Sequence, residues 1–251
     1  MIHVALRKTS LVDYPGKIAA ALFLPGCNLR CPWCHNGDLV RSEGGSGESA
    51  EFPEDSESLV PLDDALRHIE KRRAVLGAVV LSGGEPTIHR ELPELIRRIK
   101  SLELPVKLDT NGMVPEMLKA LFAEAAFRPA YIALDLKLAP ARYGELRRPA
   151  SAGNSAGNSA AALKQSAALI SASGIGHEYR SLALPGVVTP ADIEELAPLV
   201  DDSPWYFRPF RPGNCLDAAW NNREAGGPRE TEALARRARE LGKRGVSMGV
   251  E

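Results

Sequence analysis

The sequence has few cysteines, no long apolar run and almost no net charge, and each of these absences excludes a class of protein. Its 251 residues carry 31 Lys and Arg against 32 Asp and Glu, a formal net charge of −1. That balance gives no electrostatic reason to expect nucleic acid or a membrane as a partner. No apolar run approaches the roughly 20 residues that span a bilayer. The first ten residues also lack the apolar core of a signal peptide, so we expect a cytoplasmic protein.

The four cysteines are too few and too unevenly placed for a disulfide framework. Three of them, Cys27, Cys31 and Cys34, follow the spacing C-x3-C-x2-C. This clustering suits a reducing compartment better than a secreted protein. A short loop lets three thiolates converge on one metal centre, and a four-iron cube held by three cysteines keeps one iron open for a small molecule. The spacing therefore favours redox chemistry on a bound ligand.

Other interpretations of the cysteine run stay open at this point. A structural zinc site needs four Cys or His ligands, and His35 or Cys215 can supply the fourth. Disulfide pairing within the run leaves an odd thiol. Ordinary ferredoxin clusters take four cysteines, and the run has no fourth at short range.

Apolar strand-like segments alternate with segments of helical period along the chain. Strands are predicted at residues 17–24, 78–81, 106–108, 131–137, 177–184 and 205–210. Apolar residues at helical spacing lie between them, most clearly in residues 92–102. This alternation predicts a parallel sheet covered by helices, in an α/β open partial barrel of six repeats and one domain, residues 1–251. Two polar stretches, about residues 42–58 and 150–162, are predicted to be flexible loops.

Residues with unusual chemistry fall where the predicted strands end, which is where parallel α/β folds bind ligands. They comprise the cysteine run, the turn Gly83-Gly84-Glu85-Pro86, Asp109-Thr110-Asn111, and Asp135 with Lys137, while Arg180 lies within the fifth strand. Side-chain alternation places Lys107 and Asp109 on one face of the third strand, and Asp135 and Lys137 on one face of the fourth. We expect these charges to face an interior that holds either a ligand or an ion-pair network.

The Gly-Gly-Glu-Pro turn has two features that suit ligand binding. Gly83 and Gly84 permit close backbone approach and positive φ, and the Glu85 carboxylate can accept a hydrogen bond from an ammonium group. Such a turn is common by itself. Next to a cluster with an open iron, it indicates binding of an amino-acid-like ligand.

The cysteine run followed by this turn resembles the radical S-adenosylmethionine superfamily, and Trp33 matches the aromatic residue that precedes the family's third cysteine. The resemblance is closer to glycyl-radical-enzyme activating enzymes, above all to the activating proteins of anaerobic ribonucleoside-triphosphate reductase. The similar segments are residues 8–16, 31–36, 81–87, 108–112 and 134–137.

The resemblance implies a [4Fe–4S] cluster on Cys27, Cys31 and Cys34, whose fourth iron binds the amino and carboxylate groups of S-adenosyl-L-methionine (SAM). It implies that Gly83, Gly84 and Glu85 meet the methionine amino group and that Trp33 contributes to the adenine environment, mainly through its backbone. The methionine and ribose side would be lined by Asp109, Thr110, Asp135 and Lys137, with Arg180 at the ligand carboxylate.

The implied reaction begins when a one-electron donor, such as flavodoxin or ferredoxin, reduces the cluster. SAM is then cleaved, and the resulting radical takes a hydrogen atom from a glycine of a partner. The expected partner is anaerobic ribonucleotide reductase. The alternatives are another glycyl-radical enzyme or a small molecule and, from another class, a zinc-binding interaction module. Residues 245–251 contain no glycyl-radical motif, so the radical would be made in trans.

Overall fold

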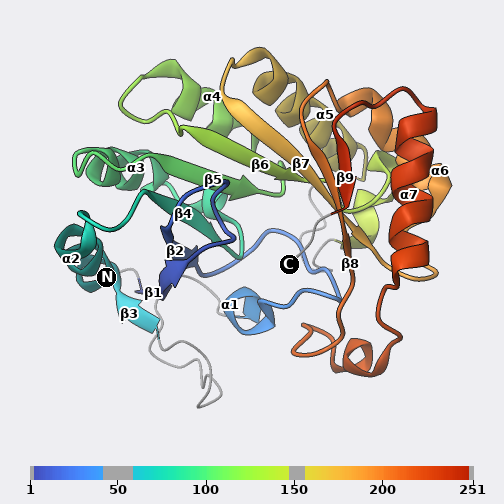
Figure 1. Ribbon diagram of the computed structural model, residues 1–251, viewed down its shortest axis with the longest axis horizontal. Helices are drawn as coiled ribbons and strands as arrows, with labels where there is room; N and C mark the ends of the chain where they lie inside the picture. Colours follow the sequence, from blue (N-terminus) through green and yellow to red (C-terminus); the bar gives the residue numbers. More distant parts are fainter. Residues whose placement is uncertain (1–2, 42–58, 147–155, 249–251) are drawn as a thin grey trace. The chain divides into compact units, whose positions relative to one another are not determined.

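The computed structural model describes residues 3–41, 59–146 and 156–248 of the chain (Figure 1). The chain divides into two compact units. The first comprises Met1–Asn28, Asn36–Thr110 and Glu116–Ile132, and the second comprises Leu29–His35, Asn111–Pro115 and Ala133–Glu251. Within the described ranges, no helix combines the length and the apolar character needed to cross a membrane.

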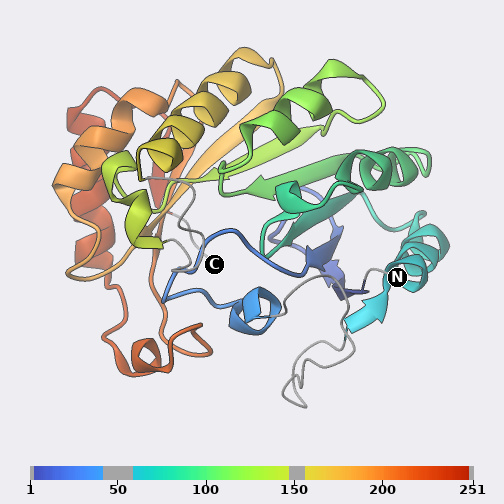
Figure 2. The same ribbon diagram turned by 180° about the vertical axis from the view of Figure 1, so that it is seen from behind.

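The first unit is a sheet of mostly parallel strands with helices packed on it. Strand β2 (Ala19–Leu24) pairs in parallel with β4 (Ala78–Gly83), which pairs in parallel with β5 (Val106–Thr110). Strand β1 (His3–Ser10) is antiparallel to β2 and to β3 (Leu59–Pro61). The helices are α1 (Gly37–Arg41), α2 (Leu62–Arg72), η1 (Pro86–Ile88), α3 (Leu92–Lys100) and α4 (Pro115–Ala123). In Figure 2, α2 and α3 are seen from behind, beside these strands.

Strands β2 and β4 are buried along almost their whole length, as expected of parallel strands covered on both faces. Helix α3 presents Leu92, Leu95, Ile96 and Ile99 to the core on one stripe. Burying these side chains stabilises the unit, because apolar area removed from water contributes about 25 cal/mol per Å².

The second unit continues the βα alternation. Strand β6 (Tyr131–Asp135) passes from the first unit into the second at Ala133. Strand β7 (Gly176–Ala183) pairs in parallel with β8 (Trp205–Pro209), and β8 pairs in parallel with β9 (Val246–Met248). The helices are η2 (Pro140–Leu146), α5 (Ala156–Ala172), α6 (Pro190–Leu196), η3 (Ala197–Leu199), η4 (Ala218–Asn222) and α7 (Pro228–Glu240). Helix α7, red in Figure 1, packs along β8, β9 and α6.

All six predicted strands are confirmed, as β2, β4, β5, β6, β7 and β8. Lys137 lies two residues beyond the end of β6, although Leu136 still donates to the carbonyl of Arg180. The prediction missed β1, β3 and β9. Strand β1 lacks a regular alternation of apolar and polar residues, because three consecutive residues, Arg7 to Thr9, are exposed. The other two strands have only three residues each, too few for a recognisable pattern.

One loop prediction is wrong in part. Residues 42–58 lie outside the described residues, as do residues 147–155 of the second predicted loop. From Ala156 onward, however, the chain forms helix α5. Alanine has the highest helix propensity, and Leu163, Ala167 and Ile170 fix the helix by burying one stripe. The repeated Ser-Ala-Gly-Asn composition concealed this helix start.

A buried carboxylate ties α6 to the segment that follows β6. Asp192, 2% exposed, caps its own helix by accepting from the backbone and hydroxyl of Thr189 at 2.9 and 2.8 Å. Its other oxygen accepts from the backbone of Ala139 at 3.1 Å and from the Arg142 guanidinium at 2.8 Å. Burial raises the pKa of Asp192, but these hydrogen bonds outweigh burial and lower it overall.

We expect Asp192→Asn to lower the free energy of unfolding by about 2–4 kcal/mol, because the amide cannot accept from all four donors and leaves Arg142 without its buried anion. The folded state prefers the ionised carboxyl, so its contribution is complete above the carboxyl pKa of the unfolded chain, near 4, and is lost as the pH falls. Urea unfolding at neutral and acid pH measures both effects. Asp202→Asn, at an exposed position, is the control, and equal stability of the two variants would contradict the assignment.

Candidate active site

In the first unit, the Gly83-Gly84 turn is joined to the loop that leads to Cys27. The backbone of Gly84 donates to Leu24 O at 2.8 Å, and the backbone of Glu85 donates to Gly26 O at 2.9 Å. A Cβ atom at Gly84 would lie 1.9 Å from Gly26 O, and one at Gly83 would lie 2.3 Å from the Leu24 nitrogen. The glycines are therefore required for two backbones to touch, a role that the sequence suggested only in relation to a ligand.

Two residues that the sequence analysis did not select complete this junction. The Nε2 atom of His89 lies 2.8 Å from Pro25 O, and the Nδ2 atom of Asn36 donates to Gly83 O at 2.8 Å. His89 follows η1, and Asn36 stands two residues after Cys34. The turn before Cys27 is thus held by both side chains as well as by the backbone.

Glu85 is buried and oriented by hydroxyl groups. Its Oε1 atom accepts from the backbone and hydroxyl of Thr87 at 3.1 and 2.5 Å, and from the Thr110 hydroxyl at 2.7 Å. The predicted residues Glu85 and Thr110 are therefore brought together from the ends of two neighbouring strands. Three donors on one oxygen fix the orientation of the carboxylate.

Lys107 and Asp109, on the same face of β5, form the charged pair that side-chain alternation predicted. Lys107 Nζ lies 3.1 Å from Asp109 Oδ1, and only 3% of the Lys107 side chain is exposed. The same ammonium donates to Asp13 O at 2.8 Å. The ammonium is thus surrounded by protein oxygens, as a buried cation requires.

In the second unit, Asp135 bridges two cations. Arg180 Nε donates to it at 2.8 Å, and Lys137 Nζ donates to it at 3.2 Å. Burial raises the pKa of Asp135, but the charges of Arg180 and Lys137 outweigh burial and hold it well below its usual range. Arg180 is therefore engaged with a protein carboxylate, a partner that the resemblance did not suggest.

Lys137 also lies in the electrostatic environment of the second and third cysteines. Burial lowers its pKa, but Asp135 acts most strongly in the opposite direction and is joined by Cys31, Tyr143 and Cys34, so the pKa is raised overall. The hydroxyl of buried Tyr143 accepts from the Lys137 backbone at 2.9 Å. Tyr143, in η2, is a further residue that no local sequence pattern indicated.

The cysteine loop of the second unit is compact. The backbone of Cys34 donates to Cys31 O at 3.0 Å, which closes a turn around Pro32 and Trp33. Cys31 is 6% exposed and Cys34 is intermediate. The Trp33 ring is 7% exposed and packs on Trp220, with ring centroids 5.2 Å apart. That packing fixes the Trp33 ring against a residue of the segment that follows β8.

The three clustered cysteines are divided between the units, with Cys27 in the first and Cys31 and Cys34 in the second. None of the chain's cysteines forms a disulfide in the ranges that the structure describes. Over those ranges, no group of three or more His, Cys, Asp or Glu side chains is gathered as a metal site. Cysteine thiolates are the soft ligands that iron–sulfur clusters take, so the chemistry of these residues fits such a cluster.

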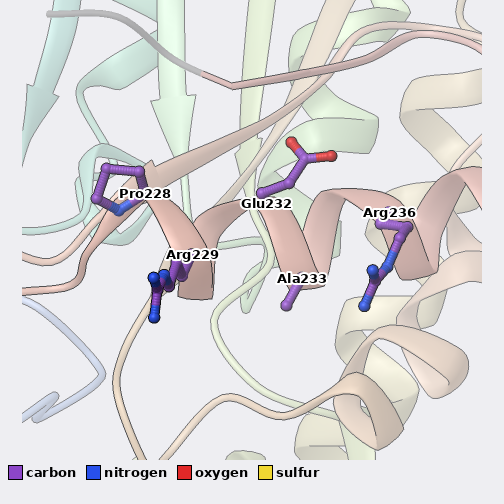
Figure 3. A pocket seen from close by; sticks show the side chains of 5 residues that line it. All are labelled: Pro228, Arg229, Glu232, Ala233 and Arg236. Atoms are coloured by element: carbon purple, nitrogen blue, oxygen red, sulfur yellow. The ribbon is translucent and has the colours of Figure 1, made fainter.

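A surface hollow on α7 contains none of the predicted site residues. It is lined by Pro228, Arg229, Glu232, Ala233 and Arg236, and Figure 3 shows these side chains along helix α7. The hollow is therefore not part of the candidate site, whose residues lie at or near the strand ends.

Parallel strands, three clustered cysteines and charged side chains on the strands describe an α/β protein with a candidate iron–sulfur site. A family model described as the radical SAM superfamily matches residues 22–199, and the chain belongs to that superfamily. Its cofactors are accordingly a [4Fe–4S] cluster and SAM, which favours the cluster over the zinc interpretation of the cysteines.

Relatives of known sequence agree with this membership. The chain is 30% identical over 236 residues to the "Putative glycyl-radical enzyme activating enzyme MJ1227" of Methanocaldococcus jannaschii, which covers 93% of this chain and 87% of the relative. It is 36% identical over 103 residues to the 7-carboxy-7-deazaguanine synthase of Aquifex aeolicus, covering 40% of this chain and 39% of the relative.

Solved structures share the fold. SuiB of Streptococcus suis superposes with a TM-score of 0.58 at 14% identity, covering 90% of this chain and 47% of SuiB. Methylornithine synthase (PylB) gives a TM-score of 0.54 at 15% identity, covering 89% of this chain and 61% of PylB. The chain thus spans about half the length of SuiB. The predicted fold class, an open partial barrel of the radical SAM type, is confirmed.

Proposed function

We propose that this protein is a glycyl-radical-enzyme activating enzyme. The observation that carries the proposal is the similarity to the Methanocaldococcus jannaschii relative of that name over 93% of the chain. A match of that extent includes both units. A relative from Haemophilus influenzae with a corresponding name is 32% identical over 96 residues. We also propose that the two units act as one catalytic domain.

In this proposal Cys27, Cys31 and Cys34 hold the cluster. Gly83, Gly84, Glu85 and Thr110 form the side of the site that takes the methionine amino group. This assignment is supported by the junction between the Gly83-Gly84 turn and the loop of Cys27, because it joins the backbone of Glu85 to Gly26, the residue before Cys27, while Thr110 orients the Glu85 carboxylate.

The charged residues have the complementary task of orienting the rest of SAM. Asp109 lies beside Lys107, and Asp135 lies between Lys137 and Arg180. Each carboxylate is held in a fixed direction by its cations, so it can accept from ribose hydroxyls or balance the sulfonium charge. Trp33 contributes its backbone at the adenine.

When bound, the cluster and SAM would supply cleavage of the sulfonium C5′–S bond, driven by one electron from the external donor, and the radical chemistry that removes a hydrogen atom from a glycine Cα of the partner. The residues of this chain would bind the cluster and SAM, orient them and exclude water from the site. No side chain has to accept a proton in the hydrogen-abstraction step.

The partner we propose is anaerobic ribonucleoside-triphosphate reductase, with flavodoxin or ferredoxin as the electron donor and the cytoplasm as the location. The partner assignment is supported by the similar segments in residues 8–16 and 31–36. A small-molecule substrate is the rival, since partial matches include a "Probable GTP 3',8-cyclase" of Pyrococcus horikoshii, 36% identical over 109 residues. That match covers 43% of this chain, which weakens the rival.

We expect the reconstituted protein, incubated anaerobically with dithionite, SAM and anaerobic ribonucleotide reductase, to produce a glycyl-radical signal in electron paramagnetic resonance. The hydrogen atom must come from the reductase glycine, so a reductase with alanine at that position is the matched control and should give no signal. A second glycyl-radical enzyme tests the choice of partner. Formation of 5′-deoxyadenosine without a radical on either protein would overturn the activating function.

A further inference from the structure

The segment between β8 and α7 is a closed surface loop. It leaves the sheet at Phe210, whose backbone donates to Ala183 O at 3.1 Å, and it returns at Gly226, whose backbone donates to Phe210 O at 2.7 Å. A Cβ atom at Gly226 would lie 2.5 Å from Ala183 O, so glycine allows the two ends to meet. Loops with joined ends of this kind form compact units packed by their own side chains. We name residues 210–226 the clasp.

The clasp is bonded through its backbone to the loop of the second and third cysteines. Leu216 donates its N–H to Cys34 O at 2.9 Å, and Asp217 donates its N–H to Pro32 O at 3.0 Å. The Asn214 side chain lies 3.5 Å from His35 O. In Figure 1 the orange loop after β8 lies beside the blue segment that carries these cysteines.

Aromatic rings reinforce the backbone contact. Trp220 packs on Trp33, with ring centroids 5.2 Å apart, and on Phe210 at 5.8 Å in an edge-on arrangement. Phe210 meets the His35 ring edge-on at 6.0 Å. The Arg223 guanidinium covers the Trp220 ring at 4.0 Å. Trp220 is therefore the centre of a group that includes a residue from inside the cysteine run.

Internal bonds give the clasp a defined shape. The backbone of Cys215 donates to Asn221 Oδ1 at 2.7 Å, and the Asp217 carboxylate caps η4 by accepting from Ala219 at 3.0 Å. The Cys215 thiol is 3% exposed and lies 3.7 Å from Gly213 O. Most other residues of the clasp are exposed, so Phe210 and Cys215 are its main contributions to the core of the unit.

We propose that the clasp holds the Cys31–Cys34 backbone in the shape that receives the cluster, with Trp220 as the positioning residue. The cysteine loop contains no helix or strand, and an irregular loop is expensive to order when a ligand arrives. Fixing the Pro32 and Cys34 carbonyls in advance removes part of that cost. The inference rests on the proposed cluster ligands and adds residues that no cysteine motif contains.

The clasp is tested first in the protein without its cluster, by hydrogen exchange and mass spectrometry. We expect Trp220→Ala to accelerate exchange about tenfold in the peptide covering residues 29–36, because loss of the ring packing raises the population of the open loop. Trp220→Phe, which keeps an aromatic ring, should stay within about twofold of the wild type. Glu224→Ala, at an exposed position of the same loop, is the matched control. Unchanged exchange in Trp220→Ala would overturn the proposal.

The second test uses the reconstituted protein and the rate at which a chelator removes iron. Release from Trp220→Ala should be about tenfold faster than from the wild type and the Glu224→Ala control, with Trp220→Phe near the wild type. Trp220→Leu keeps apolar cover and serves if the alanine variant does not fold; its release should also be faster than that of the phenylalanine variant. Equal release from all variants would overturn the clasp but not the proposed function. A wild-type protein that takes up no cluster would instead refute the ligand assignment, whatever the exchange result.

Discussion

Cys31→Ala is expected to reduce 5′-deoxyadenosine formation by at least about a hundredfold, since loss of an outer-shell partner alone can cost a metal site 10–100-fold. Two thiols cannot replace three as the anchor of a four-iron cluster that keeps one iron open. Anaerobic reconstitution followed by chromatography of the nucleoside products, with dithionite and SAM present, measures this loss. Iron and sulfide analysis of the same samples shows whether the cluster itself is missing.

Cys215→Ala is the matched control for that experiment. Cys215 is buried like Cys31, with exposures of 3% and 6%, but its thiol lies against Gly213 O within its own turn. Replacing Cys215 by alanine should leave product formation within about twofold of the wild type, because its thiol is not a proposed ligand of the cluster and the substitution removes only one sulfur atom from the fold. Wild-type rates from Cys31→Ala, or a loss as large from Cys215→Ala, would contradict the assignment of the ligands.

Gly84→Ala is expected to lower the free energy of unfolding by about 3 kcal/mol or more, because its Cβ would lie 1.9 Å from Gly26 O and one backbone must move. The displaced backbone is the one that leads to Cys27. The variant should therefore also take up less iron on reconstitution, even at temperatures where it remains folded. Urea unfolding and iron analysis measure the two effects separately.

Gly77→Ala is the natural control for Gly84→Ala. A Cβ at Gly77 would meet the Lys17 Cβ at 3.4 Å, an ordinary contact. Its free energy of unfolding should stay within about 0.5 kcal/mol of the wild type. Comparable destabilisation by both variants would show that the close approach of Gly84 and Gly26 has no special importance.

The sequence predicted the parts of the fold that depend on local pattern. Buried strands such as β4 have apolar residues in succession, and their ends are marked by glycine or by charged residues. Alternation also gave the Lys107–Asp109 and Asp135–Lys137 pairs, because residues two apart on one strand share a face. The start of α5 was missed because Gly, Asn and Ser suggest a loop, whereas packing of Leu163 and Ile170 decides in favour of a helix.

The site residues that the sequence did not predict contact partners far away in the sequence. His89 lies 64 positions from Pro25, and Asn36 lies 47 positions from Gly83. Neither side chain belongs to a periodic pattern or a turn signature that points to its partner. Tyr143 and Trp220 are similar, since a single aromatic residue in a short 3₁₀ segment has no local sign of what it will contact. Only the folded arrangement reveals that these residues support the segments chosen from sequence.

The contact between Trp220 and Trp33 has a consequence for the order of events during translation. Synthesis proceeds from the N-terminus, so the second and third cysteines leave the ribosome long before the ring that packs beside them exists. Until residues 210–226 have been made, their loop has neither the N–H donors of Leu216 and Asp217 nor its aromatic neighbour. If the clasp shapes the loop as proposed, delivery of iron and sulfide to a properly shaped loop follows synthesis of the clasp.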